Sequence, residues 1–154
     1  MSLFPENVNF LSTVRYIKGG RSAGNFVNFN LALHVNDKTD SVLENRSILK
    51  DYYELPSEPV WINQTHSSIC IDASLTERVM EADASFTLNS GTVCSILTAD
   101  CLPVFVSKKD GTMVGVAHAG WKGLISGVIE NLIEAFGCSG EELVVHLGPA
   151  ISKN

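Results

Sequence analysis

The chain is predicted to form one α/β (α+β) domain over residues 1–154, a layered mixed β-sheet with flanking helices. Two apolar runs, LPVFVS (102–107) and TMVGVAHA (112–119), flank an Asp-Gly pair, a strong signal of an antiparallel hairpin. From Gly120 onward, apolar residues recur at three- and four-residue steps, which predicts a helix. A hairpin combined with strands on both sides of helices indicates a mixed sheet.

The N-terminal third is predicted to contain one strand and one helix. NFLSTVRYI (9–17) has the pattern of a strand and leads into the glycine-rich loop KGGRSAGN (18–25). Apolar residues at near-helical spacing predict a helix over 39–55, which Pro56 would stop. Three residues at its start are candidate N-caps: Thr39, Asp40 and Ser41.

Three further segments are predicted to contribute strands. PVWINQTHSSICID (59–72) has the pattern of two strand segments around a polar bend at 64–68. TVCSILTAD (92–100) is a short apolar run typical of a buried strand, and ELVVHLG (142–148) is another. Because His66 lies in the polar bend at 64–68, it is expected at a turn.

Composition and charge limit the classes of function. Hydrophobic residues make up 45% and charged residues 18% of the chain, as in ordinary globular proteins. The net charge of −6 and the absence of a basic run argue against nucleic-acid binding. No apolar stretch approaches the ~20 residues that span a bilayer, and MSLFPENVNF lacks the features of a signal peptide. We expect a cytoplasmic protein whose four cysteines are reduced thiols.

The hairpin geometry predicts that Cys101 and His118 meet. The turn lies at one end of the hairpin, so the residues before the first strand and at the end of the second converge at the other. Together with His66 they would give three soft or borderline ligands, the usual number in a catalytic zinc site with an open fourth position. Spacing alone leaves two alternatives open: polar residues at strand ends, and a cysteine nucleophile activated by His118.

Three more residues are candidate site residues. Asp100 precedes Cys101 and could orient a ligand or act as a general base, although an aspartate there is also a common turn residue. HAGWKG (118–123) runs from a strand into a helix, where free backbone N–H groups and Lys122 could hold an anion such as phosphate. Trp121 could pack in the core or stack on an aromatic ring.

Several motifs together resemble the YfiH family, long labelled a laccase domain or multicopper polyphenol oxidase. The matching stretches run in order from about Gly19 to Ile151 and are GGRSAGNFVNFNLALHVND, ENRSIL, NQTHSS, ADASFT, TADCLPVFV, GVAHAGWKG and HLGPAI. The resemblance implies an α/β fold and a zinc ion held by His66, Cys101 and His118. It also implies phosphorolysis of adenosine, inosine, guanosine and methylthioadenosine, with adenosine deamination.

The implied chemistry gives roles to further side chains. Phosphorolysis needs phosphate placed against the ribose, for which Arg46, Lys122 and the amides of HAGWKG are candidates. Asp100 or Gln64 could move a proton or fix a ligand, and Trp121 could contact the base. Multicopper catalysis needs many imidazoles, and the chain has four histidines, which argues against a true laccase. A zinc-stabilised binding module without catalysis is a third alternative.

Two features depart from the family pattern. Lys122 stands where family members commonly have arginine, so the bidentate fork is lost there. The sequence also stops just after GPAI (148–151), where family members continue with a cysteine-containing loop, strands and helices. We therefore expect the YfiH-like domain to be C-terminally incomplete. Oligomeric state and the preferred nucleoside do not follow from the sequence.

Overall fold

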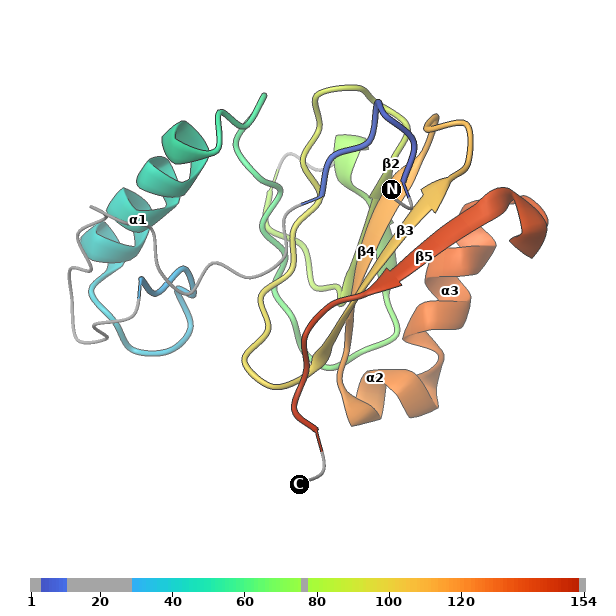
Figure 1. Cartoon of the computed structure of the whole chain (residues 1–154). Coiled ribbons are helices and arrows are strands. Elements are labelled where there is room, and N and C mark those ends of the chain that lie inside the picture. Colours follow the sequence, from blue (N-terminus) through green and yellow to red (C-terminus); the bar gives the residue numbers. More distant parts are fainter. Residues whose placement is uncertain (1–3, 11–28, 76–77, 153–154) are drawn as a thin grey trace. The chain divides into compact units, whose positions relative to one another are not determined.

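The computed structural model describes residues 4–10, 29–75 and 78–152 (Figure 1). The chain forms two compact units, one of residues Thr13–Glu58 and the other of residues Met1–Ser12 with Pro59–Asn154. The predicted strand over 9–17 falls outside the described residues except for its first two positions, as does the whole glycine-rich loop. Whether the chain acts as a single domain stays a prediction.

The larger unit contains a five-stranded mixed sheet in the order β1-β2-β4-β3-β5. Strand β1 pairs in parallel with β2, and the other neighbours are antiparallel. The predicted α+β class with a mixed sheet and flanking helices is therefore confirmed. The strands comprise β1 (Cys70–Asp72), β2 (Ala84–Thr87), β3 (Leu102–Lys108), β4 (Val114–Ala119) and β5 (Leu143–Leu147).

The predicted hairpin is confirmed as β3 and β4. Its register pairs Leu102 with Ala119 and continues without a break to Ser107 and Val114. Gly111 allows the tight connection because its φ of 72° lies in the left-handed region that side chains disfavour. The end of the hairpin opposite this turn is where Cys101 and His118 were expected to meet.

The helix expected after Gly120 is broken into two. Helix α2 covers Trp121–Ser126 and α3 covers Val128–Ala135, and the residue between them, Gly127, has a φ of 89°. The spacing of apolar residues does not reveal a change of backbone conformation at a single residue. The prediction of one continuous helix was therefore wrong. The next left-handed glycine, Gly137 with φ of 58°, follows the end of α3, where glycine commonly ends a helix.

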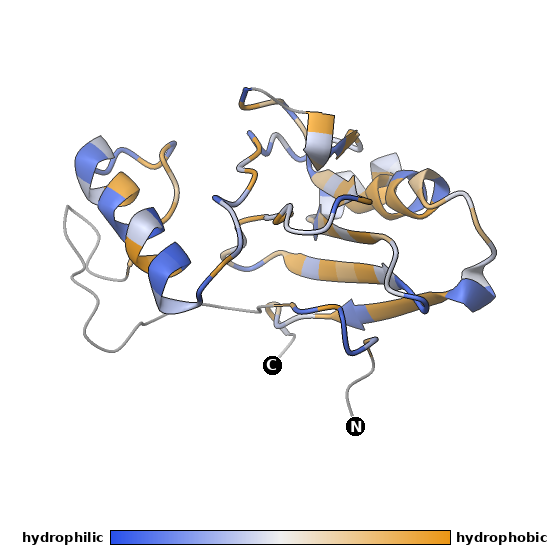
Figure 2. Cartoon of the chain, turned by 90° about the horizontal axis from the view of Figure 1, so that it is seen from above, coloured by the Kyte–Doolittle hydropathy of each residue, from blue (hydrophilic) through white to orange (hydrophobic). Residues whose placement is uncertain are grey.

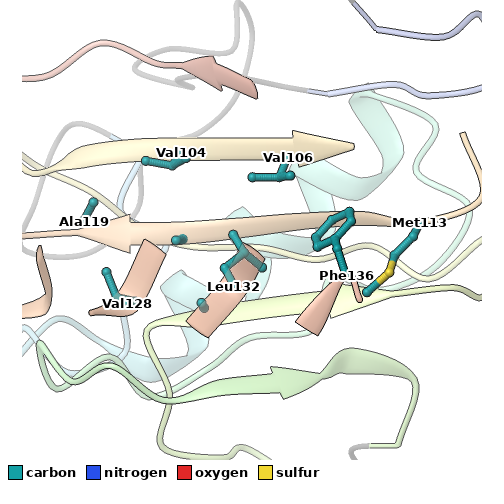
Figure 3. Packing of buried hydrophobic residues seen from close by; sticks show 9 residues of the cluster. Val104, Val106, Met113, Ala119, Val128, Leu132 and Phe136 are labelled. Atoms are coloured by element: carbon teal, nitrogen blue, oxygen red, sulfur yellow. The ribbon is translucent and has the colours of Figure 1, made fainter. Parts of the chain in front are cut away.

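The core of this unit lies between the sheet and α3 (Figure 3). Apolar colour is concentrated on the strands and along α3 (Figure 2). Side chains from both layers are almost fully buried, and the cluster consists of Ala84, Val104, Val106, Met113, Ala117, Ala119, Val128, Leu132 and Phe136. This packing against α3 fixes β4, which carries His118, and β3, which directly follows Cys101.

The segments before β1 and before β3 are less regular than predicted. Residues 92–100 form no strand; Cys94 makes one isolated bridge to Val60. The 59–72 segment has strand structure only at β1, and its other contact of this type joins Asn63 to Glu81. The two segments are joined by a backbone bond from Val60 N to the Val93 carbonyl at 2.9 Å and by a side-chain bond from Ser95 Oγ to the Val60 carbonyl at 2.8 Å.

The smaller unit contains the predicted helix, α1 (Thr39–Tyr52). Its N-cap is Lys38, which makes no side-chain cap, so the predicted cap at Thr39, Asp40 or Ser41 was wrong by at least one residue. The helix also ends before Pro56 is reached. Buried Val42 and Leu49 lie on its inner face.

The remaining predictions concern β5, the cysteines and the membrane. β5 confirms the strand expected over 142–148, and a capping box at Ser139 and Glu142 precedes it. All four cysteines are free, as expected. Among the described residues, no helix is both long and apolar enough to cross a bilayer. A cytoplasmic location stays a prediction.

Truncation of a core side chain on α3 should cost far more stability than truncation of an exposed one on α2. Leu132 is 0% exposed, and we expect Leu132→Ala to lower the free energy of unfolding by about 2–5 kcal/mol because it leaves a cavity. Ile125 is 80% exposed, so Ile125→Ala should change it by less than about 0.5 kcal/mol. Urea unfolding of both variants measures this, and equal losses would contradict the packing described.

Candidate metal centre

Three potential metal ligands meet at the end of the hairpin that lies away from its turn. One ligand atom from each of His66, Cys101 and His118 lies within 4.8 Å of the other two. His118 is on β4 and pairs with Pro103, while Cys101 directly precedes β3. The predicted convergence of Cys101 and His118 is therefore present, and the predicted bend brings His66 to the same place.

The three side chains differ in their exposure. His118 is buried, Cys101 is half-buried and His66 is exposed. The rings of the two histidines are nearly perpendicular, with centroids 4.8 Å apart. The cluster is thus attached to the sheet through His118 and open to solvent at His66. A site that a small molecule reaches needs such an open side.

His66 has an unusual backbone conformation. Its φ of 61° is in the left-handed region, which is uncommon for a residue with a side chain. Backbone N–H groups on either side of this position donate to one carboxylate: Thr65 N to Asp83 Oδ2 at 3.1 Å and Ser67 N to the same oxygen at 2.6 Å. The amide of His66 itself donates to Asp83 Oδ1 at 3.1 Å. These bonds hold the bend in place.

Asp83 was not predicted as a site residue. It is fully buried, and its Oδ1 lies 2.8 Å from Nδ1 of His118. An acceptor-only carboxylate at this distance places the proton on Nδ1, which leaves Nε2 of His118 as the nitrogen with a free lone pair. The available sequence signal was an acidic residue directly before an apolar strand, in EADASFT (81–87).

Burial and hydrogen bonding act in opposite directions on Asp83. Burial by itself raises the pKa of the carboxyl, but the hydrogen bonds from His118, Ser67 and Thr65 outweigh it and the net pKa is lowered. The group is thus an anion at neutral pH. A buried anion beside the cluster favours the binding of a cation there.

The environment of Cys101 favours its protonated form in the absence of a cation. Burial raises the pKa of the thiol, and a hydrogen bond to Asp100 and the negative charges of Asp100 and Asp83 raise it further. A nucleophilic cysteine needs the opposite shift, toward the thiolate. A divalent cation would displace the thiol proton, so the same surroundings are compatible with a metal ligand.

Gly120 leaves the space into which two of the ligands extend. A Cβ atom added there would lie 2.9 Å from Cδ2 of His66 and 3.1 Å from Sγ of Cys101. Gly120 has φ of −68° and ψ of 161°, so its backbone does not require glycine. Its small size is therefore required by the approach of the two ligand side chains alone.

The donor set fits a borderline divalent transition metal. Two imidazoles and a thiolate, with a buried carboxylate behind one imidazole, make up three ligands and an orienting partner. Three protein ligands leave a further coordination position for water or substrate. The four histidines of the chain do not supply the additional imidazoles of a multicopper centre.

Gln64 and Asp100 have different surroundings from those of the three ligands. Gln64 Nε2 donates to the Leu97 carbonyl and its Oε1 accepts from the Leu97 amide, both at 2.7 Å. This pair of bonds joins the bend to the segment before Cys101, which is a positioning role. Asp100 is exposed and lies beside the Cys101 thiol. A role for either in proton transfer stays a prediction.

Trp121 and Lys122 begin α2, immediately after Gly120. Trp121 is 67% exposed, so it is not the core aromatic that was one of its two interpretations. Lys122 Nζ lies 5.6 Å from the centroid of the Trp121 ring, a cation–π contact. Both side chains are exposed, and they directly follow Gly120, which contacts His66 and Cys101.

Arg46 belongs to the smaller unit. Its Nε and one terminal nitrogen both donate to the Leu31 carbonyl, at 2.9 and 2.8 Å. The residue is buried, and its burial lowers the pKa of the guanidinium while the charge of Glu58 acts in the opposite direction. In this structure Arg46 ties α1 to the preceding loop, and a contact with phosphate stays a prediction.

Comparison with known proteins identifies the family. The sequence model of the family described as multi-copper polyphenol oxidoreductase laccase matches residues 11–154. The chain belongs to this family. It is 38% identical over 147 residues to a purine nucleoside phosphorylase of Haemophilus influenzae, covering 96% of this chain and 59% of that protein. It is 40% identical over 148 residues to the purine nucleoside phosphorylase YfiH of Escherichia coli, covering 96% of this chain and 60% of that protein.

A solved structure supports the same relationship. The crystal structure of a Neisseria meningitidis protein matches with a TM-score of 0.89 at 39% identity, over 99% of this chain and 62% of that one. The resemblance to the YfiH family is therefore confirmed. The chain spans about three-fifths of the length of the curated relatives it matches.

Enlarging Gly120 should disturb the cluster without disturbing the backbone. We expect Gly120→Ala to weaken Zn²⁺ or Co²⁺ binding by roughly tenfold or more, because the new methyl group displaces His66 and Cys101. Gly140→Ala is the matched control, since a Cβ there meets nothing within 4 Å. Metal titration of both variants by calorimetry measures the effect. Unchanged affinity in Gly120→Ala would show that the ligands do not use this space.

Metal binding should depend on pH through Cys101. Its pKa is raised in the metal-free protein, so a bound cation must release the thiol proton. Below that pKa, the affinity for Zn²⁺ should rise about tenfold per pH unit for one proton released, over about pH 7.5 to 8.5. Cys101→Ser should lose most of this slope. Competition with a chromophoric chelator at several pH values measures it, and an equal slope in both proteins would contradict the assignment.

Proposed function

We propose that this chain carries the metal centre of a zinc-dependent purine nucleoside phosphorylase. The observation that carries the proposal is the cluster of His66, Cys101 and His118, within 4.8 Å and with three rather than four ligands. Relatives at 38–42% identity are named purine nucleoside phosphorylase. The proposed substrates are phosphate with adenosine, inosine, guanosine or methylthioadenosine. Deamination of adenosine is proposed as a second activity of the same site.

The proposed metal would be held by the two imidazoles and the thiolate. When bound, zinc supplies a Lewis acid that lowers the pKa of coordinated water and polarises a substrate oxygen. His118 would be the most rigid ligand because it is buried and bonded to Asp83, and His66 would face the substrate side because it is exposed. The remaining work of binding and proton transfer falls to side chains around the cluster.

The groups next to the cluster suit a nucleoside and an anion. The exposed indole of Trp121 offers an aromatic face against which a purine can stack. Lys122, beside it, offers a positive charge for phosphate, and Arg46 remains a second candidate for that role. Asp100 and Gln64 are the proposed proton-transfer or ligand-fixing residues. An unchanged Michaelis constant for phosphate in Arg46→Ala would remove Arg46 from this assignment.

Two other functions make different predictions about the same residues. A cysteine-nucleophile hydrolase or deamidase would use Cys101 and His118 without a metal, but the raised pKa of Cys101 counts against it. Such an enzyme would keep its activity with chelators and lose it with iodoacetamide. A zinc-stabilised binding module without catalysis would unfold on chelation and show no turnover, and the open side of the cluster counts against it.

The proposal is tested by metal content and by phosphate-dependent release of adenine from adenosine. Mass spectrometry of the 154-residue chain should find about one zinc per chain, because one three-ligand cluster is present among the described residues. Cys101→Ala should lose the zinc and reduce adenine release by at least about a hundredfold, as expected when a metal ligand is removed. Cys138→Ala, which changes a cysteine outside the cluster, is the control.

The outcomes separate the functions. Zinc with phosphate-dependent turnover, both lost in Cys101→Ala, supports the phosphorylase. Turnover that survives removal of zinc contradicts it and favours the cysteine nucleophile. Zinc without turnover in this chain, and also without turnover in a full-length relative carrying the same three ligands, contradicts it in favour of a structural site.

A further inference from the structure

We propose that Asp83 is a positioning residue that sets two of the three metal ligands at once, His118 through its ring and His66 through the backbone of its turn. The buried carboxylate accepts five hydrogen bonds. One comes from the ring of His118, and the other four come from the turn that contains His66. This inference rests on the metal centre of the proposed function, but it concerns an interaction that exists before any metal or substrate binds.

The first half of the role is the choice of tautomer in His118. Oδ1 of Asp83 lies 2.8 Å from Nδ1 of His118, and both side chains are almost completely buried. A carboxylate only accepts, so Nδ1 must carry the proton and Nε2 must keep its lone pair. The lone pair is what a metal needs, so Asp83 prepares the imidazole as a ligand and also fixes the plane of the ring.

The second half is the conformation of the turn that presents His66. The turn places His66 at a φ of 61°, which a side-chain-bearing residue adopts only when its surroundings enforce it. Three successive N–H groups, of Thr65, His66 and Ser67, all point at the Asp83 carboxylate. The Ser67 hydroxyl adds a further bond to Oδ2 at 2.8 Å. Asp83 therefore acts as the anion around which the turn is wrapped.

Both oxygens of the carboxylate accept hydrogen bonds, so an amide cannot replace it. Oδ1 accepts from His118 and His66, and Oδ2 accepts from Thr65 and Ser67. Asparagine has the same shape but only one acceptor oxygen, and its NH₂ group would face donors in either orientation. Asp83→Asn must therefore lose either the bond that holds His118 or the bonds that hold the turn.

The backbone of Asp83 is anchored independently of its side chain. Its carbonyl accepts from the His118 amide at 2.7 Å, and its own amide donates to the Ile69 carbonyl at 3.0 Å. These bonds belong to the pairing that brings β1, β2 and β4 together, and they do not involve the carboxylate. An isosteric change of the side chain thus leaves the sheet connections in place.

The decisive measurement is ¹⁵N NMR of the histidine ring nitrogens in the metal-free chain at about pH 8, where an unperturbed imidazole is neutral. Wild type should show His118 with its proton on Nδ1, and Ser67→Ala should show the same, because that variant removes the hydroxyl with its bonds to Asp83 and to the Ile69 amide and leaves the carboxylate. Where its NH₂ group faces the ring, Asp83→Asn should move His118 toward the Nε2–H tautomer; where its oxygen faces the ring, the tautomer is kept and the turn loses the bonds of Thr65 and Ser67 instead. A purely structural role for Asp83 would not produce this shift at one ring.

Zinc affinity gives the second readout. Competition with a chromophoric chelator should show binding about 10- to 100-fold weaker in Asp83→Asn and within about threefold of wild type in Ser67→Ala. An Nε2–H tautomer of His118 in wild type would overturn the proposal, and this result needs no variant to fold. A wild-type tautomer and wild-type zinc affinity in Asp83→Asn would also overturn it. These readouts involve no nucleoside, so their outcome is independent of whether the proposed phosphorolysis occurs.

Discussion

The antiparallel pairing of β3 with β4 is the interaction on which the candidate metal centre depends. The register aligns Pro103 with His118 and Leu102 with Ala119, so Cys101 comes opposite Gly120 at the end of the ladder. A shift of one residue would turn His118 to the other face of the sheet, because side chains alternate along a strand. The buried core between the sheet and α3 keeps that register, since Val104, Val106 and Ala117 must face the helix.

Charge organises the site once the strands have placed its parts. The buried carboxylate of Asp83 bonds to the ring of His118 on β4, 35 residues further along the chain, and to the turn that carries His66, so two separate segments share one anion. The same negative charge and that of Asp100 raise the pKa of the Cys101 thiol. A divalent cation would balance the negative charge of Asp83 and would take the place of the proton on the Cys101 thiol. The surroundings are therefore matched to a metal and poorly matched to a free cysteine nucleophile.

The family relationship and the site point to the same chemistry from independent directions. The family carries a laccase description, whereas the curated relatives are named purine nucleoside phosphorylase. A single cluster of two histidines and one cysteine among the described residues agrees with the second description, since multicopper catalysis needs many more imidazoles. The chain contains this cluster within about three-fifths of the relatives' length.

The sequence alone determined the elements with strong local signals. The Asp-Gly turn defined the β3–β4 hairpin, periodic apolar residues defined α1 and α3, and several motifs together identified the family and predicted the three candidate ligands. Only the tertiary structure decided the break at Gly127, the irregular path of 92–100 and the bonding of Gln64 to Leu97. It alone assigned Asp83 and Gly120 to the site. Local patterns encode turns and periodicity, whereas the choice of a distant hydrogen-bond partner or the space beside a glycine depends on how separate segments pack.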